Sequence, residues 1–189
     1  MTHMAPRRRQ TGFTLIEILI TLLIIPVGLL GLASVHAQML VNQFESYQRA
    51  QALLLVQDMT SRIRSNSRLA RAGSYTTGDY GLIPKDCSDA TVTSAGAVSI
   101  DLCEWGEQIR GVSVTEAGKQ LGSIIKGRGC IENLPALADG GAVIRVTVAW
   151  QGLSATVVPA SACGADEYGA DDSVRRVVSV DVVLAKLGL

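Results

Sequence analysis

The chain carries, close to its start, the segment Arg7-Arg8-Arg9-Gln10-Thr11-Gly12-Phe13-Thr14-Leu15-Ile16-Glu17. An apolar run follows the glycine and reaches about Ala37, and Glu17 is the one ionised residue inside it. A charge near the middle of a membrane costs roughly 2.5–3.5 kcal/mol on insertion scales. Glu17 is therefore a candidate functional residue.

The apolar run predicts a membrane span. Residues 13–35 number 23, and a helix needs about 20 apolar residues to cross a bilayer. The arginines remain cytoplasmic by the positive-inside rule, so the bulk of the chain lies outside. A secretory signal is cut after its apolar region, whereas Gly12 precedes it, and a cut there keeps the helix on the mature protein. The alternative, a plain signal anchor with an accidental glycine, leaves Glu17 unexplained.

Length and charge indicate one domain beyond this helix. The 189 residues contain 17 basic and 17 acidic side chains, a net charge of +0. Residues 1–12 hold three arginines and no acid, so their removal leaves 14 against 17, or −3. A mildly acidic chain with only 4% aromatic residues is unlike a nucleic-acid binder.

The cysteines all follow the span, on the side predicted to be oxidising: Cys87, Cys103, Cys130 and Cys163. An even number there indicates two disulfides, and no C-x-x-C motif points to a metal or redox site. Four cysteines allow three pairings, between which the sequence does not choose; we favour the sequential one. The alternative is four buried thiols.

A long helix is predicted from about Phe13 to Arg71, because no glycine or proline interrupts the chain from Leu40 onward. Its second half is amphipathic. The apolar residues at roughly helical spacing are Leu40, Phe44, Tyr47, Leu54, Leu55, Met59 and Ile63, and the polar face holds Glu45, Arg49, Asp58 and Arg62. Gly73 is the expected stop.

The remainder predicts an α+β domain. Residues 72–98 read as loop, and 100–110 as a short helix with a core stripe of Leu102, Trp105 and Ile109. Alternating residues predict strands over 143–150 and 174–185, with weaker candidates at 130–134 and 155–158. We expect a small antiparallel sheet with one apolar face, covered by the amphipathic half of the long helix.

The segment from Gly12 to Glu17, with its apolar run, resembles the class III prepilin leader of type IV pilins. The resemblance implies that a prepilin peptidase cuts after Gly12, that Phe13 becomes N-methylated, and that Glu17 forms a charge pair during assembly. It also implies the pilin fold, a long helix packed on a small sheet. The expected parts are a leader (1–12), a transmembrane half-helix (13–37), an amphipathic half-helix (38–71) and a periplasmic domain (72–189).

Three further segments resemble PilV, the type IV pilus modification protein: Gly28-Leu29-Leu30-Gly31-Leu32, Tyr47-Gln48-Arg49-Ala50-Gln51-Ala52 and Asp58-Met59-Thr60-Ser61-Arg62-Ile63-Arg64-Ser65-Asn66. This implies a minor pilin, anchored in the bacterial inner membrane and incorporated in the extracellular pilus, that acts in pilus assembly, twitching motility and adhesion. The implied partners are other minor pilins, the major pilin and the inner-membrane assembly platform. The alternatives are a minor pseudopilin of type II secretion and a DNA-uptake or adhesion tip pilin.

Pro26 lies inside the apolar run and removes the backbone bond to the Leu22 carbonyl. Two interpretations are open. One is a harmless kink of the sort common in membrane helices. The other is a segment that stretches or bends inside a filament.

Catalysis has little support, so we expect a structural subunit without cofactor or metal. The histidines are His3 and His36, and neither H-E-x-x-H nor a P-loop motif occurs. The acidic group Asp166, Glu167, Asp171 and Asp172 lacks EF-hand spacing and reads as a solvated loop. Arg62, Arg64, Arg68 and Arg71 read as solvated charges that complement the helix dipole. Gly127-Arg128-Gly129 reads as a turn.

Processing gives the first prediction. The mature chain should begin at Phe13 with an N-methyl group, and Gly12→Ala should leave the precursor in the membrane, because the peptidase of the resembled family needs the glycine. Intact mass of the membrane-extracted protein measures both. A stable species that still begins at Met1 would contradict the assignment.

Overall fold

The computed structural model describes residues 12–75, 78–111, 115–116, 119–120, 124–138 and 140–186. The chain divides into two compact units, Met1–Gln43 and Phe44–Leu189. The longest element, helix α1 (Leu15–Ser65), belongs to both.

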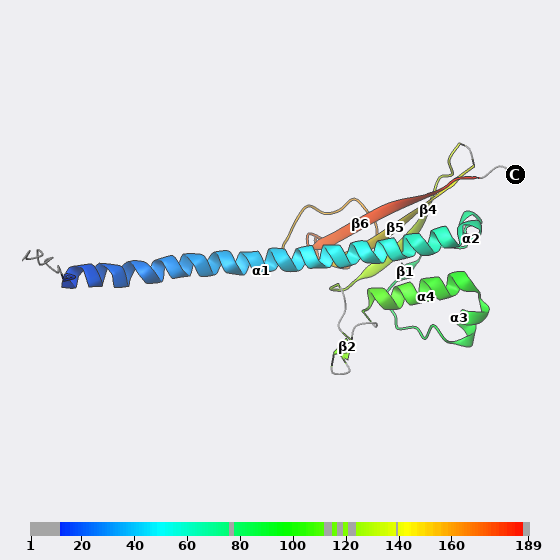
Figure 1. Cartoon of the computed structure of the whole chain (residues 1–189). Coiled ribbons are helices and arrows are strands. Elements are labelled where there is room, and N and C mark those ends of the chain that lie inside the picture. Colours follow the sequence, from blue (N-terminus) through cyan, green and yellow to red (C-terminus); the bar gives the residue numbers. More distant parts are fainter. Residues whose placement is uncertain are drawn as a thin grey trace, which may run out of the picture. The chain divides into compact units, whose positions relative to one another are not determined.

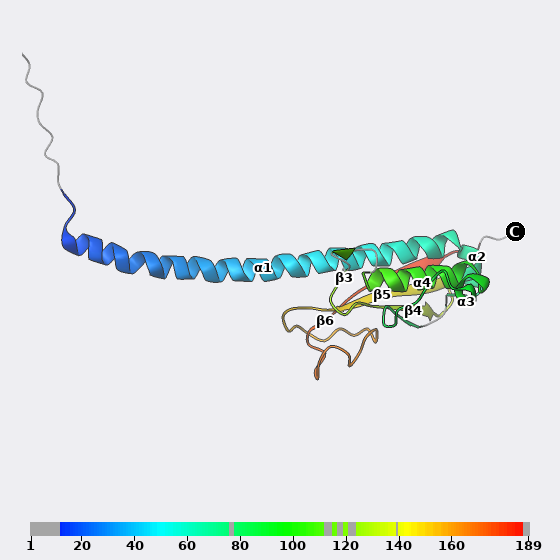
Figure 2. The ribbon, with the colours of Figure 1, turned by 90° about the horizontal axis from the view of Figure 1, so that it is seen from below.

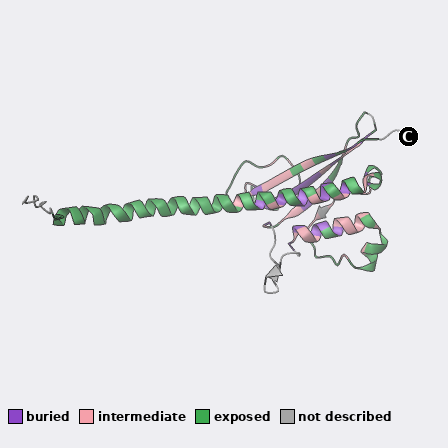
Figure 3. Cartoon of the chain, viewed as in Figure 1, coloured by how far each residue is buried: buried purple, intermediate pink, exposed green. Residues whose placement is uncertain are grey.

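In the first unit, α1 is exposed on all sides (Figure 3). The helix continues through Pro26, and its most apolar window has a mean hydropathy of 2.6. It is the one helix of the described chain that is long and apolar enough to cross a membrane, judged by length and composition. An apolar surface of this extent needs lipid or other apolar helices around it.

In the second unit, one face of α1 is buried: Gln48, Ala52, Leu55, Val56, Met59, Thr60 and Ile63. The prediction was therefore right for Leu55, Met59 and Ile63. It was wrong for the other stripe, because Phe44, Tyr47 and Leu54 remain 42–57% exposed. The two stripes lie on different sides of the helix, and the sheet covers only one of them.

Helix α1 ends at Ser65 rather than continuing to Arg71. Asn66 leaves the helical conformation, and its side-chain amide donates to the Tyr75 hydroxyl (3.2 Å) and to Asp101 (2.9 Å). A short helix α2 (Ser67–Arg71) follows. Gly73, at φ 76°, follows the end of α2, whereas the sequence predicted it as the stop of the single long helix.

The segment predicted as loop contains strand β1 (Asp79–Tyr80), helix α3 (Ala90–Ser94) and the start of helix α4 (Ala97–Ile109). The second predicted helix therefore exists but begins earlier than residue 100. Its stripe is confirmed, since Trp105 and Ile109 are buried and Leu102 packs against them. Two short strands follow, β2 (Thr115–Glu116) and β3 (Lys119–Gln120).

The main sheet is antiparallel, in the order β1-β4-β5-β6. Its long strands are β4 (Arg128–Leu134), β5 (Ala142–Gln151) and β6 (Arg175–Leu184) (Figure 1). Both strong strand predictions and the weaker one near residue 130 are confirmed. The prediction at 155–158 was wrong: that segment is irregular and contributes a single backbone bond, from Thr156 N–H to the Ser173 carbonyl (2.7 Å).

Both faces of the sheet are covered. On one face, Ile131, Ile144, Val146, Val148 and Val182 form the main core with α1 and α4, which run beside each other over the sheet (Figure 2). On the other face, Ala149, Cys163 and Tyr168 form a second cluster with Val177. The expectation of a single apolar face was therefore incomplete, because Ala149, Cys163 and Tyr168 show no periodicity of their own.

Glycine allows α4 to lie close to β4. A Cβ on Gly129 would come within 2.4 Å of the Trp105 ring. Trp105 is fully buried, and its indole N–H donates to the Leu55 carbonyl of α1 (2.8 Å). The ring cannot move aside without losing that bond.

We therefore expect Gly129→Ala to lower the free energy of unfolding by about 1–3 kcal/mol, the usual range for overpacking. Gly106→Ala in α4 is the matched control, because the nearest atom to a Cβ there is the Gly81 backbone nitrogen at 3.4 Å, an ordinary contact distance. Alanine is also favoured over glycine inside a helix by about 0.5–1 kcal/mol. Urea denaturation measures both. Equal effects of the two substitutions would refute this account of the Trp105 contact.

Candidate functional site

The segment predicted to be processed lies just ahead of α1. Gly12 and Phe13 precede the helix and are exposed, Phe13 by 82%. Nothing lies within 4 Å of a Cβ built on Gly12. Within the described chain, the peptide bond between Gly12 and Phe13 is thus outside secondary structure and open to an enzyme.

Thr14 caps the start of α1. Its hydroxyl accepts from the Glu17 N–H (3.3 Å), and its carbonyl accepts from the same group (3.1 Å). The pattern Thr14-x-x-Glu17 is that of a capping box. We did not single out Thr14 from the sequence, although this pattern could have identified it.

Glu17 lies exposed in the first turn of α1. A carboxylate is favourable there, because unpaired N–H groups give a helix start a partial positive charge. The surrounding exposed residues are apolar, among them Leu15, Ile16, Ile18 and Leu19. Glu17 is therefore the one acidic group on an apolar surface that must be covered by something outside the described chain.

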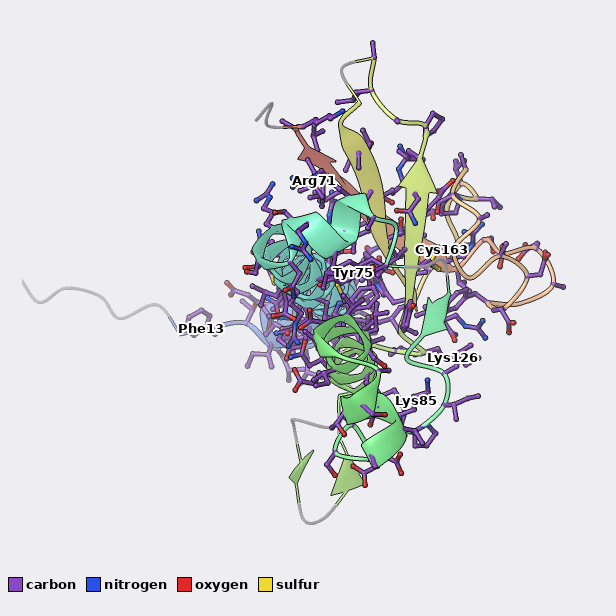
Figure 4. The ribbon with its side chains drawn as sticks, turned by 90° about the vertical axis from the view of Figure 1, so that its right-hand side faces the viewer. Phe13, Arg71, Tyr75, Lys85, Lys126 and Cys163 are labelled. Atoms are coloured by element: carbon purple, nitrogen blue, oxygen red, sulfur yellow. A yellow bond between two sulfur atoms is a disulfide. The ribbon has the colours of Figure 1, made fainter. Side chains whose placement is uncertain are left out.

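The four cysteines form two disulfides in the pairing that we favoured. Cys87–Cys103 joins the segment before α3 to α4, and Cys130–Cys163 joins β4 to the irregular segment before β6. In Figure 4, Cys163 lies on the side of the sheet away from α1. Both disulfides fix segments that have no regular pattern of apolar residues. A disulfide typically adds about 2–4 kcal/mol to the free energy of unfolding.

A polar network holds the far end of α1 to α4. Arg62 contacts Asp58 (2.8 Å), Asp101 (3.2 Å) and Glu104 (2.7 Å), so it is not the solvated charge that we expected. Burial alone would lower the pKa of Arg62, but the bonds to these three acids together outweigh that effect and raise it. The Tyr75 hydroxyl donates to Asp101 (2.7 Å), and burial followed by this bond raises the pKa of Tyr75 to about 12.

Glu45 holds the other end of this helix segment to the domain. Its carboxylate accepts from the N–H groups of Leu153 (2.9 Å) and Ser154 (3.2 Å) and pairs with Arg176 (3.3 Å). Burial alone would raise the pKa of Glu45. The bonds from Leu153 and Ser154 and the charge of Arg176 outweigh that effect and lower it.

The acidic segment after Cys163 was predicted to be a solvated loop, and the structure corrects this in part. Asp172 is buried and pairs with the buried Arg175 (2.9 Å), whose guanidinium also donates to backbone carbonyls of the segment, including that of Cys163 (3.0 Å). Glu167 pairs with Arg128 (2.8 Å). Two of the four acids therefore fix the segment to the sheet.

Residues 7–33 match the family description "Prokaryotic N-terminal methylation motif". Comparison with curated proteins and with solved structures gave no significant match. The motif indicates a type IV pilin or a pseudopilin-like protein, a structural subunit whose leader is processed by prepilin peptidase. With the long apolar helix, it also indicates membrane anchoring.

The Glu45 contact predicts a pH dependence. The folded state lowers the pKa of Glu45 from 4.5. The ionised carboxylate therefore contributes fully to the free energy of unfolding above pH 4.5, and this contribution is lost as the pH falls through the pKa of the folded state. Glu45→Gln should therefore cost about 1 kcal/mol at pH 7, and the difference from the parent should shrink toward pH 3. Urea denaturation of both chains at several pH values measures it. A difference that stays constant from pH 7 to pH 3 would exclude ionisation of Glu45 as its cause.

Proposed function

We propose that this chain is a minor pilin, a structural subunit that enters a type IV pilus and supports its assembly. The methylation motif carries the proposal, and it occurs here together with a capped apolar helix joined to a disulfide-bonded α+β domain. The proposed partners are the major pilin, other minor pilins and the inner-membrane assembly platform. The segments 47–52 and 58–66, which resemble PilV, support the finer assignment.

In the proposed mechanism, prepilin peptidase cuts after Gly12 and methylates Phe13. Thr14 then caps a helix that begins next to the new terminus. While the chain is in lipid, Glu17 is an acid without a counter-charge among apolar residues, which is unfavourable. In a bundle of pilin helices, the positive terminus of one subunit meets Glu17 of another. This pairing favours one axial register over the others.

The same motif suits a minor pseudopilin of type II secretion, and gene deletion separates the two roles. Loss of pili and twitching with normal secretion supports the pilus role. Loss of protein secretion with normal pili supports the pseudopilin role. Normal fibres with lost attachment or DNA uptake would instead indicate a tip module.

Glu17 supplies the direct test. Glu17→Ala and Glu17→Gln should both leave the chain folded and membrane-anchored but reduce its amount in sheared pili about tenfold or more, because both remove the charge. The control is Thr21→Val in the same helix, since the one bond that the Thr21 hydroxyl makes in the described chain is to the Ile18 carbonyl of its own helix (2.9 Å). Immunoblots of sheared and cell fractions measure incorporation. Normal incorporation of Glu17→Gln would show that charge pairing is not the cause.

A further inference from the structure

The outer edge of β6 presents backbone groups to solvent. Gln151 N–H bonds to the Ile125 carbonyl, on the β4 side of β5, whereas Gly152 N–H bonds to the Val174 carbonyl, on the β6 side. The side to which a residue points its N–H and C=O groups alternates along a strand, so the even-numbered residues of β5 point toward β6. They pair with even-numbered residues of β6, such as Val146 with Val180, and these therefore point their N–H and C=O groups at β5. The residues that point outward are Val177, Ser179, Asp181 and Val183.

Contacts cover only the two ends of this edge. Thr156 N–H bonds to the Ser173 carbonyl (2.7 Å) before the strand, and Arg71 bonds to the Ala185 carbonyl (3.4 Å) after it. Between them, the backbone groups of the four outward residues have no hydrogen-bond partner within the described chain. A full antiparallel strand could bond there.

The edge also lacks the usual protection. Open edges commonly carry lysine, proline or a bulge that prevents pairing with another chain. Residues 177–183 read Val-Val-Ser-Val-Asp-Val-Val, and each pairs regularly with β5. The one charge, Asp181, is neutralised by Arg145 through two bonds of 2.8 and 3.0 Å.

This heptad is nearly the same when read backward, with only Ser179 and Asp181 exchanged. When two copies pair antiparallel about Val180, Val177 lies opposite Val183 of the other copy, and Ser179 lies opposite Asp181. Every outward residue then faces an outward residue, which gives about eight backbone hydrogen bonds. A hydroxyl meets a carboxylate, and no like charges are directly opposed.

We propose that the β6 edge docks the β6 edge of a second copy, antiparallel, with the two-fold axis at Val180. Val178 and Val180 are only half-buried, and Val183 is 57% exposed, so the second strand would cover them. About seven residues per strand bury less than the roughly 800 Å² per partner of a standard interface. The pair is therefore weak and best detected by covalent trapping.

The direction of β6 limits where this pair forms. β6 starts beside Glu45, which contacts Arg176, and ends beside Arg71, which contacts Ala185. It thus runs in the same direction as α1 from Phe44 onward, and the Phe44 ends of an antiparallel pair point in opposite directions. On the proposed function, chains in one membrane or fibre share a direction, so the pair joins copies from different fibres.

The test uses the full chain in detergent under mild oxidation. Val180→Cys should give a disulfide dimer at least tenfold more readily than Val178→Cys, because only Val180 faces itself across the axis, at a Cα separation that a disulfide spans. Separately, mixing chains with Ser179→Cys and Asp181→Cys should give the heterodimer, which tests the same register at exposed positions. Absence of both products, or equal trapping at positions 178 and 180, would overturn the proposal.

A second substitution tests the backbone bonds. In the Val180→Cys chain, Ser179→Pro removes an N–H that points away from β5, so the sheet remains intact while dimer trapping falls at least tenfold. Ser179→Ala keeps the N–H and should retain trapping. Circular dichroism verifies folding. Unchanged trapping in a folded Ser179→Pro chain would exclude the β6 pairing. That result would not contradict the proposed function, which the Glu17 variants test separately.

Discussion

The burial of one face of α1 is the constraint on which the second unit depends. Ala52, Val56, Met59 and Ile63 have no exposed surface, and each large apolar side chain buried in this way contributes about 1.5–3 kcal/mol. The sheet supplies the opposing surface, and α4 is held in place by the bond from Trp105 to the Leu55 carbonyl. Gln48 lies on the same buried face with both amide atoms unpaired within the described chain, and nothing in the structure explains its choice over an apolar residue.

The same helix meets two physical environments. From Leu15 to Gln43 the helix is mostly apolar and is exposed on all sides, whereas from Phe44 onward one face is covered by the domain. The first part makes no use of the domain core, which begins near Gln48. The domain core is therefore built without side chains from the exposed first part of α1.

Polar contacts fix the segments that hydrophobic pattern leaves undetermined. Glu45 and Arg62 hold the two ends of the packed helix segment, and the pair Asp172–Arg175 holds the irregular segment on the far face of the sheet. The buried charges of Asp172 and Arg175 are tolerated because they pair with each other and because Arg175 also donates to backbone carbonyls. Loss of Glu45 or Arg175 would free a whole segment, because each bonds backbone groups of that segment. Arg62 instead bonds the side chains of Asp101 and Glu104 on α4.

Local patterns in the sequence determined the prepilin-like leader, the long apolar helix and the strands β5 and β6, because charge order and periodicity are properties of neighbouring residues. The sequence also indicated two disulfides but left their pairing open. The tertiary structure decided which apolar stripe of α1 faces the sheet, that α1 stops at Ser65, and that residues 155–158 form no strand. It also decided that Asp172 and Arg175 are buried and that Gly129 lies under Trp105. These depend on residues far apart in the chain, such as Asn66 with Asp101, and local periodicity carries no information about which distant groups will meet.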